Sequence, residues 1–437
     1  MKRLIYDRLV GWKLSIPHKP LILLGARQVG KTYILKEFGE NEFPRMVYLN
    51  CHEDERAQWL FRNLDTDRIL RELESISECT IKEGETFVFF DEIQEVNNGI
   101  ASLKYFCENH PTLHVAVAGS LLGISLRENE SYPVGKVQTM RLYPMSFNEY
   151  LEALGKHKLL ECLRELSWET LTMHHEVLTT LLREYMFVGG MPEAVAEYTS
   201  THNATHVREI QAEISDAYIR DVSKHTKPTI QRIHQVWESI PAQLARENKK
   251  FIFGAVRRGA RAADFETALQ WLTDAGLIYK IERCKKPIPP IKFYSDSSAF
   301  KIYMFDCGLL AYMCGASPKE MLGGNSAFVE FKGALTENYV LQQLQSVCDS
   351  NGVFYFAKDN STQEIDFLTQ FGNQVIPIEV KAEVNVKSKS LSGFVNVDHA
   401  NQHLKGLRFS MQPYTDQGWM ENIPLYAAEA YFNRCNQ

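Results

Sequence analysis

The sequence lacks paired cysteines and long apolar runs. Its nine cysteines are scattered, none forms a CxxC pair, and the count is odd, so neither a disulfide framework nor a zinc site is expected. This usage favours a reducing, cytoplasmic environment. No apolar run approaches the roughly 18 residues that a membrane-spanning helix needs. The N-terminal stretch MKRLIYDRLVGWKL mixes charge into its apolar positions, unlike a signal peptide.

The sequence also lacks an excess of positive charge. The 437 residues carry a net charge of −6, which excludes a protein that coats nucleic acid by charge alone. The share of hydrophobic residues, 45%, is ordinary for a globular protein. At this length we expect about two to three domains.

An apolar run followed by glycines and a lysine, PLILLGARQVGKT, lies near the start of the chain. Residues 21–24 are typical of a strand buried on both faces, and TYILKEFGE has helical spacing. Strand, loop and helix form the context in which G-x-x-x-x-G-K-[ST] binds phosphates. Gly25 and Gly30 would let loop amides approach a triphosphate, Lys31 would meet its β- and γ-phosphates, and Thr32 would hold Mg²⁺. The alternative is an ordinary strand–turn–helix.

Two further apolar runs end in polar residues. TFVFFDEIQEV ends its apolar part at Asp91 and Glu92, and LHVAVAGSLLG leads to Ser120. A buried acidic pair is costly without a partner, and a Mg²⁺-bound nucleotide is such a partner. Asp91 would reach the Mg²⁺, and Glu92 would orient or deprotonate the attacking water. Ser120 would sense the γ-phosphate, or alternatively cap a helix.

The order of these runs predicts a parallel sheet covered by helices over residues 1–150. Buried strands alternate with helical segments, as in α/β folds. Ligands of such folds bind at the carboxyl ends of the strands, where all three motifs lie. We therefore expect a domain that binds ATP and Mg²⁺ and hydrolyses the nucleotide.

Several motifs resemble one family. GARQVGKT, FFDEIQ, VAVAGSLL and LYPMSFNEYL together resemble the bacterial and archaeal AAA-type ATPases that carry a C-terminal DUF4143 region. GGMP at 189–192 and IRDV at 219–222 are similar to further motifs of that family. The resemblance covers nearly the whole chain.

The chain departs from the family pattern at one charged position. The family often has Gly-Arg shortly before the L-x-P-x-S-F segment, whereas this chain has Gly135 and Lys136. Lysine is a compact point charge without the planar fork of arginine, so Lys136 does not match an arginine finger. Arg127 and Arg141 are the neighbouring candidates, with a solvated surface charge as the alternative for each.

The middle of the chain contains two segments with different predicted secondary structure. Residues 151–238 have helical patterns, and the resemblance implies a lid over the nucleotide. Further on, FIFGAVRRGARAADFETALQWLTDAGLIYKIERC predicts two helices and a hairpin, a winged-helix pattern. Residues 241–292 contain eleven Lys or Arg and five Asp or Glu, which favours a surface that faces nucleic acid. The second helix carries acidic residues, so a structural or protein-binding module is the open alternative.

The last part of the chain resembles a PD-(D/E)xK nuclease core. FKGALTENYVLQQL predicts a helix with Glu337, and two strands carry Asp366 and then Glu379 and Lys381. Glu337, Asp366 and Glu379 would hold Mg²⁺, and Lys381 would favour the attacking hydroxide. Surface strands also alternate Glu and Lys, and such a fold can bind DNA or act as a scaffold without cleaving it.

Together these patterns predict an α/β protein with four parts. We expect a P-loop ATPase domain over 1–150, a helical lid over 151–238, a winged helix over 239–320 and a restriction-endonuclease-like core over 321–437. The predicted function is an ATPase that couples its nucleotide state to a DNA-binding region, with cleavage left open. The alternative is an NTP-driven signalling or assembly switch whose C-terminal half binds a protein without catalysis. Either function is compatible with an oligomer. Neither function involves a membrane.

Overall fold

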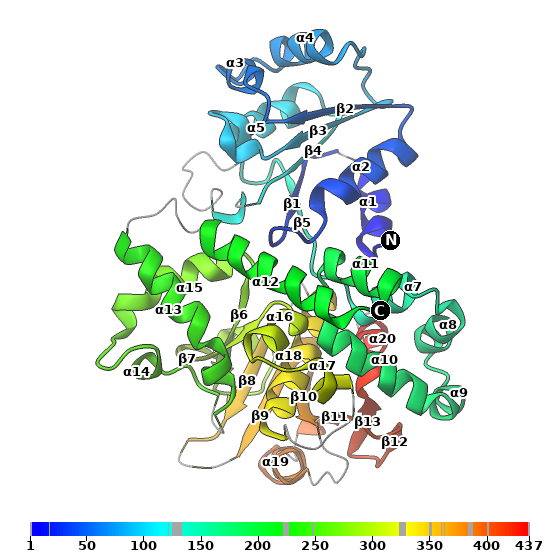
Figure 1. Ribbon diagram of the computed structural model, residues 1–437, viewed down its shortest axis with the longest axis vertical. Coiled ribbons are helices and arrows are strands. Elements are labelled where there is room, and N and C mark those ends of the chain that lie inside the picture. Colours follow the sequence, from blue (N-terminus) through cyan, green and yellow to red (C-terminus); the bar gives the residue numbers. More distant parts are fainter. Residues whose placement is uncertain are drawn as a thin grey trace. The chain divides into compact units, whose positions relative to one another are not determined.

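The computed structural model describes residues 2–16, 18–120, 122–124, 133–221, 227–246, 249–322, 329–348, 352–359, 361, 363–382, 388–399 and 402–435. The chain forms two compact units (Figure 1). Unit 1 contains Met1–Tyr143 and Asp274–Leu277, and unit 2 contains Pro144–Thr273 and Ile278–Gln437. The break after Tyr143 lies before the boundary predicted at residue 150.

Unit 1 contains a five-stranded sheet in the order β2-β3-β4-β1-β5. All four pairs of neighbouring strands are parallel, which confirms the predicted parallel α/β arrangement. The strands are β1 (Leu21–Leu24), β2 (Arg45–Asn50), β3 (Thr86–Asp91), β4 (His114–Ala118) and β5 (Gln138–Arg141). The helices are α1 (Ile5–Lys13), α2 (Lys31–Glu42), α3 (Arg56–Leu60), α4 (Thr66–Ser77) and α5 (Gly99–Asn109).

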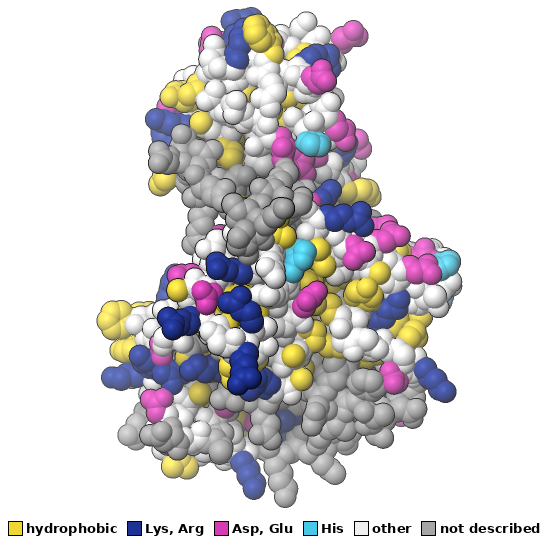
Figure 2. Space-filling view, turned by 60° about the vertical axis from the view of Figure 1, so that its left-hand side comes forward, with side chains coloured by type: hydrophobic (Ala, Val, Ile, Leu, Met, Phe, Trp, Pro, Cys, Tyr) yellow, Lys and Arg dark blue, Asp and Glu magenta, His cyan; other side chains and the backbone are white. Residues whose placement is uncertain are grey.

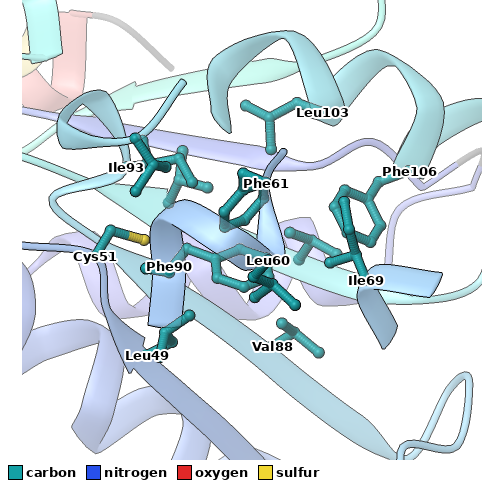
Figure 3. Packing of buried hydrophobic residues seen from close by; sticks show 14 of the residues in the cluster. Leu49, Cys51, Leu60, Phe61, Ile69, Val88, Phe90, Ile93, Leu103 and Phe106 are labelled. Carbon is teal, nitrogen blue, oxygen red and sulfur yellow. The ribbon is translucent and has the colours of Figure 1, made fainter. Parts of the chain in front are cut away.

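Aromatic packing fixes strand β3 from one face of the sheet. Figure 3 shows Phe61, Phe90 and Phe106 in one cluster of buried hydrophobic residues. Phe61 and Phe90 are fully buried, and their ring centroids lie 5.2 Å apart in an edge-on arrangement. Truncating such a buried phenylalanine typically costs about 3–5 kcal/mol. The cluster therefore holds the strand whose end carries Asp91.

Unit 2 contains a mixed eight-stranded sheet in the order β12-β13-β11-β10-β9-β8-β6-β7. Strands β10, β11 and β13 run parallel, whereas β8, β9 and β10 pair antiparallel. The strands are β6 (Ile278–Cys284), β7 (Ser295–Met304), β8 (Val353–Ala357), β9 (Glu364–Phe371), β10 (Gln374–Lys381), β11 (Gly406–Ser410), β12 (Thr415–Asp416) and β13 (Met420–Pro424).

The predicted hairpin is present, but it belongs to this larger sheet. Strands β6 and β7 pair antiparallel, and β6 also pairs with β8. The preceding helices are α14 (Phe253–Val256) and α15 (Ala262–Asp274). Phe265, Ala268 and Leu272 of α15 are buried, as their spacing predicts. The hairpin therefore extends a sheet formed largely by later strands.

The helical region predicted after the first domain lies in unit 2. Its helices are α7 (Phe147–Ala153), α8 (His157–Glu165), α9 (Trp168–Met173), α10 (His175–Val188), α11 (Pro192–Thr201), α12 (Ala204–Asp221) and α13 (Lys227–Leu244). The later helices are α16 (Cys307–Met313), α17 (Pro318–Leu322), α18 (Val329–Val347), α19 (Lys389–Gly393) and α20 (Ala428–Cys435).

The GGMP motif forms a tight turn between α10 and α11. The backbone N–H of Gly190 donates to Asp306 Oδ2 at 2.6 Å, and Met145 N donates to the carbonyl of Gly190 at 2.6 Å. Gly189 has a φ of 79°, and a Cβ there would lie 2.3 Å from Asp306 Oδ1. The motif thus allows three distant segments of unit 2 to meet at close range.

The LYPMSF segment anchors the start of unit 2. Ser146 and Glu149 form a reciprocal capping box at the start of α7. Phe147 N donates to Gln343 Oε1 of α18 at 3.0 Å, and Asn148 N donates to Glu429 Oε2 of α20 at 3.2 Å. The segment therefore ties α7 to the C-terminal helices.

Candidate nucleotide site and carboxylate cluster

The loop between β1 and α2 has the backbone geometry of a phosphate-binding loop. Gly25 has a φ of 150°, and a Cβ there would lie 2.3 Å from the carbonyl oxygen of Leu142. Gly30 precedes α2 with a φ of 95°. These conformations suit glycine, and the loop leads directly into the amino end of a helix, where backbone amides favour anions.

Lys31 is held inside this loop. Its Nζ donates to the carbonyl oxygens of Gly25 and Ala26, both at 2.8 Å. Burial lowers the pKa of Lys31 to about 8, against the opposing charges of Glu92 and Asp91. A buried cation is stabilised by a nearby anion, and a phosphate group would supply one.

Thr32 and Asp91 meet at the ends of α2 and β3. The Thr32 hydroxyl donates to Asp91 Oδ2 at 2.7 Å. Asp91 is only 4% exposed, and burial, together with the charge of Glu92, raises its pKa. A hydroxyl beside a carboxylate is the donor set that Mg²⁺ uses in P-loop proteins. These two residues fit that ion.

Glu92 is held by Ser120 from the end of the neighbouring strand. Ser120 Oγ donates to Glu92 Oε1 at 2.6 Å, and Ser120 N donates to Oε2 at 2.9 Å. Gln94 Nε2 donates to the same Oε2 at 2.5 Å. Burial alone would raise the pKa of Glu92, but these hydrogen bonds outweigh it and lower the pKa. The carboxylate is therefore ionised and able to accept a proton.

Two residues that contact the carboxylates of this site were not predicted from the sequence. Gln94 fixes Glu92, and its position two residues after the acidic pair was the available clue. The second is Tyr48 on β2, whose hydroxyl donates to Asp91 Oδ2 at 3.4 Å. Strand β2 neighbours β3 in the sheet, an order that local sequence patterns do not give.

The three basic residues considered for the role of an arginine finger differ in their positions. Arg127 lies outside the described residues. Lys136 pairs with Glu108 at 3.0 Å on the surface. Arg141 ends β5 opposite Leu24, and its charge contributes, after burial, to the lowered pKa of Lys31. Arg141 is therefore the candidate that lies near the phosphate-binding loop.

In unit 2 the structure brings the predicted nuclease-like residues into one region. Val380 N donates to Asp366 Oδ2 at 2.8 Å, which joins β9 to β10. Lys381 Nζ lies 3.2 Å from Glu379 Oε1. Burial raises the pKa of Asp366 to about 7, and the charge of Glu337 on α18 adds to this. Helix α18 also contacts β10.

The carboxylates of this region are paired with lysines that the sequence analysis did not include. Lys249 Nζ donates to Glu337 Oε1, and the Tyr303 hydroxyl donates to Glu337 Oε2 at 3.2 Å. Lys301 Nζ pairs with Glu364. Across the described parts of the chain, no three His, Cys, Asp or Glu side chains are placed to hold a metal ion. The geometry favours internal ion pairs.

Basic side chains gather on the face of unit 2 that Figure 2 turns forward. Arg257, Arg258 and Arg261, which lie between α14 and α15, are exposed. On the connection between β6 and β7, Phe293 is 80% exposed and Lys292 is exposed beside it. An exposed lysine beside an exposed aromatic ring suits a nucleic-acid strand, and exposed arginines suit its phosphates.

Family comparisons divide the chain into three matched regions. Residues 17–151 match an AAA domain. Residues 179–320 match DUF8612, a domain of unknown function, and residues 332–427 match DUF4143, another domain of unknown function. Among the described helices, none has the length and apolar character needed to cross a membrane.

Individual proteins show more distant similarity. An uncharacterized protein of Methanocaldococcus jannaschii is 26% identical over 383 residues, covering 86% of this chain and 77% of that protein. A Walker-type ATPase of Pyrococcus abyssi is 15% identical, with a TM-score of 0.45 over 71% of this chain and 95% of that chain. The Aeropyrum pernix ORC1 protein, solved in complex with DNA, is 11% identical, with a TM-score of 0.28 over 71% of this chain and 91% of that chain.

Proposed function

We propose that this chain, in which residues 17–151 match an AAA domain and residues 332–427 match DUF4143, binds ATP with Mg²⁺ and hydrolyses it. The observation that carries the proposal is the 2.7 Å hydrogen bond from Thr32 Oγ1 to Asp91 Oδ2. It joins the phosphate-binding loop to the acidic strand at the carboxyl end of a parallel sheet, where nucleotides bind.

Each side chain has a separate role in this proposal. Backbone amides after Gly25 and Gly30 bind the phosphates, and Lys31 contributes a positive charge. Thr32 and Asp91 would hold Mg²⁺, which neutralises charge on the phosphate oxygens when bound.

Two residues act on the γ-phosphate side. Glu92 accepts a proton from the attacking water, and Ser120 holds Glu92 ionised and senses the γ-phosphate. Arg141 supplies a second positive charge near the loop. These roles are those that positioning and charge stabilisation require in phosphoryl transfer.

The test compares two variants that act on different steps. Lys31→Ala removes the charge that meets the phosphates, so ATP affinity should fall at least tenfold. Glu92→Gln keeps the shape and removes the base, so ATP should bind normally while turnover falls by about 100-fold or more. Equilibrium binding and steady-state turnover measure the two effects. Normal hydrolysis by Glu92→Gln would show that another group is the base.

We further propose that nucleotide state is coupled to DNA binding by unit 2. The support is the exposed basic segment at Arg257, Arg258 and Arg261, together with Phe293 on the β6–β7 connection. The alternative, a nucleotide-driven switch whose C-terminal region binds a protein without catalysis, is favoured by the ion pairs of the carboxylate cluster. Cleavage of DNA would require a cation at that cluster.

A further inference from the structure

Gln94 lies beside the proposed base on a short turn that is fixed by its neighbours. It belongs to the 3₁₀ helix η1 (Ile93–Glu95), which follows β3. Glu92 precedes this turn in the left-handed conformation, with a φ of 51°. From α3, Gln58 Nε2 donates to the carbonyl oxygen of Glu95 at 2.7 Å. The turn thus returns the side chain of Gln94 to that of Glu92.

The two ends of the Gln94 amide have different environments. Nε2 donates to Glu92 Oε2 at 2.5 Å. The opposite orientation of the amide would turn its oxygen toward an ionised carboxylate, so charge fixes which end faces Glu92. Oε1 is buried and has no hydrogen-bond partner within the described part of the chain. A buried acceptor without a donor is unfavourable, which indicates that a donor from a ligand belongs there.

The amide occupies a space that exists because residue 119 is glycine. A Cβ on Gly119 would lie 1.9 Å from Gln94 Oε1 and 2.8 Å from its Cδ. Gly119 directly follows β4, and β4 pairs parallel with β3. The unpaired oxygen therefore lies where the carboxyl ends of these two strands meet, which is the edge at which such sheets bind ligands.

The chemistry of an amide oxygen limits what can occupy this position. Oε1 only accepts hydrogen bonds, and the oxygens of an ionised γ-phosphate also only accept them. The nearby protein donors are engaged, since Lys31 donates to the Gly25 and Ala26 carbonyls and Ser120 Oγ donates to Glu92. A water molecule has two protons to donate, and the water that attacks the γ-phosphate must lie next to its base.

We propose that Gln94 positions the attacking water by accepting a hydrogen bond through Oε1 while its Nε2 holds Glu92. The inference rests on the ATP hydrolysis proposed above. One proton of the water passes to Glu92, and the other remains hydrogen-bonded to Gln94, which itself exchanges no proton. The water oxygen bonds to the γ-phosphorus, and the bond from that phosphorus to the bridging oxygen of ADP breaks.

The first variant, Gln94→Met, removes both polar ends at similar size. We expect ATP affinity to be retained and turnover to fall by about tenfold or more, because the water is no longer oriented. Loss of the Nε2 donor should also raise the pKa of Glu92 and move the acidic limb of the rate profile to higher pH. The rates are therefore compared on the plateau above that limb, where Glu92 is ionised in both proteins. A deficit that persists there reports the action of Oε1.

Equilibrium binding provides a readout that does not depend on turnover. ADP with aluminium fluoride mimics the phosphoryl group during transfer, with the water in place. Gln94→Met should bind this mimic about tenfold more weakly than the parent does, and should bind ADP alone equally well.

A second variant displaces the amide without removing it. The Cβ of Gly119→Ala would occupy the space of Gln94 Oε1, so the plateau rate should fall as in Gln94→Met. In a Gln94→Ala background the same change should cause little further loss, because both substitutions act on one contact. Gly11→Ala is the matched control, since a Cβ on Gly11 meets no atom within 4 Å, and it should behave like the parent.

The outcomes separate this inference from the proposed function. A parent that hydrolyses ATP, with a Gln94→Met variant that keeps its plateau rate and its affinity for the mimic, would overturn the inference alone. A faster Gln94→Met enzyme would also overturn it, because Gln94 would then restrain Glu92. A parent without ATP turnover would refute the proposed function and this inference together. If Gln94→Met does not fold, a normal plateau rate in Gly119→Ala decides against the inference.

Discussion

Two carboxylates that are adjacent in the sequence, Asp91 and Glu92, have different environments. Burial raises the pKa of Asp91, whereas hydrogen bonds from Ser120 and Gln94 outweigh burial and lower the pKa of Glu92. The pair was predictable because both residues follow a buried strand. The hydroxyl that holds Glu92 lies 28 residues further along the chain, and only the parallel pairing of β3 and β4 brings it close.

Removing that hydroxyl should change the pH dependence of hydrolysis. Ser120→Ala deletes the Oγ donor to Glu92, so the pKa of Glu92 should rise. Because the base acts when ionised, the acidic limb of the rate profile should move to higher pH. We expect turnover at neutral pH to fall by about 10-fold to 100-fold, with ATP affinity retained.

Ser120→Thr is the matched control, because it keeps a hydroxyl at the same carbon. It should retain the pH profile of the parent. A Ser120→Ala enzyme with reduced turnover and an unmoved acidic limb would contradict the proposed action through Glu92, and would leave a direct contact with the γ-phosphate.

A buried histidine pair predicts acid sensitivity of unit 1. His18 and His114 are 7% and 9% exposed, and their ring centroids lie 4.0 Å apart. Burial, followed by the charge of His114, lowers the pKa of His18 to about 4, and burial also lowers that of His114. Lys13 lies nearby through its backbone carbonyl, which contacts His114. The folded state therefore binds fewer protons than the unfolded state in mild acid.

The direction in which stability changes with pH follows from the difference in proton binding between the folded and unfolded states. Stability should be complete above a pH of about 6.5, the ordinary histidine value, and should be lost as the pH falls toward about 4. The contribution of His18 is on the order of 3 kcal/mol. His18→Leu should flatten this loss without abolishing it, because His114 still titrates. Thermal unfolding followed from pH 7 to 4 measures the effect, and equal pH slopes for both proteins would contradict it.

At the scale of elements, individual helices and strands could be predicted from the sequence. The pairing of one strand with another could not. The spacing of Phe265, Ala268 and Leu272 predicts the buried face of α15, because helix periodicity is local. The pairing of β6 with β8 is not local, since it joins segments on either side of α16, α17 and α18. For the same reason Lys249 could not be assigned to Glu337, which lies 88 residues away.

The basic segment before α15 predicts salt-dependent DNA binding. If Arg257, Arg258 and Arg261 contact phosphates, log affinity should fall linearly with log salt concentration. Replacing all three with glutamine should reduce the magnitude of that slope by up to about 3, since each lost phosphate contact removes about one. Fluorescence anisotropy with a labelled duplex at several salt concentrations measures the slope.

An equal change of charge elsewhere in unit 2 provides the control. Lys156, Lys158 and Arg183 are exposed on or beside α8 and α10, and replacing them with glutamine should leave the slope unchanged. Equal slopes for the parent and the Arg257, Arg258 and Arg261 variant would place DNA contact elsewhere. Absence of binding at low salt would favour the protein-binding alternative.

At the scale of the whole molecule, the fold class could be predicted from the sequence, but the division of the chain into compact units could not. The parallel sheet and the helical region follow from patterns in the sequence. The winged helix and the nuclease-like core were predicted as separate parts, whereas their strands lie in one mixed eight-stranded sheet. The four-part division, with boundaries at 150, 238 and 320, stays a prediction, and the structure has two compact units. Packing between distant segments decides such units, and a sequence pattern does not record it.

Unit 1 is not continuous along the chain, because it includes Asp274–Leu277 in addition to its first 143 residues. Ribosomal synthesis therefore delivers the five-stranded sheet of unit 1 well before the last piece of that unit. That piece arrives only after Pro144–Thr273 of unit 2 has been made, so the completed first unit depends on the synthesis of that part of unit 2. Insertions, gene fusions and exchanges between related chains that cut at residue 143 would separate a unit from a part of itself.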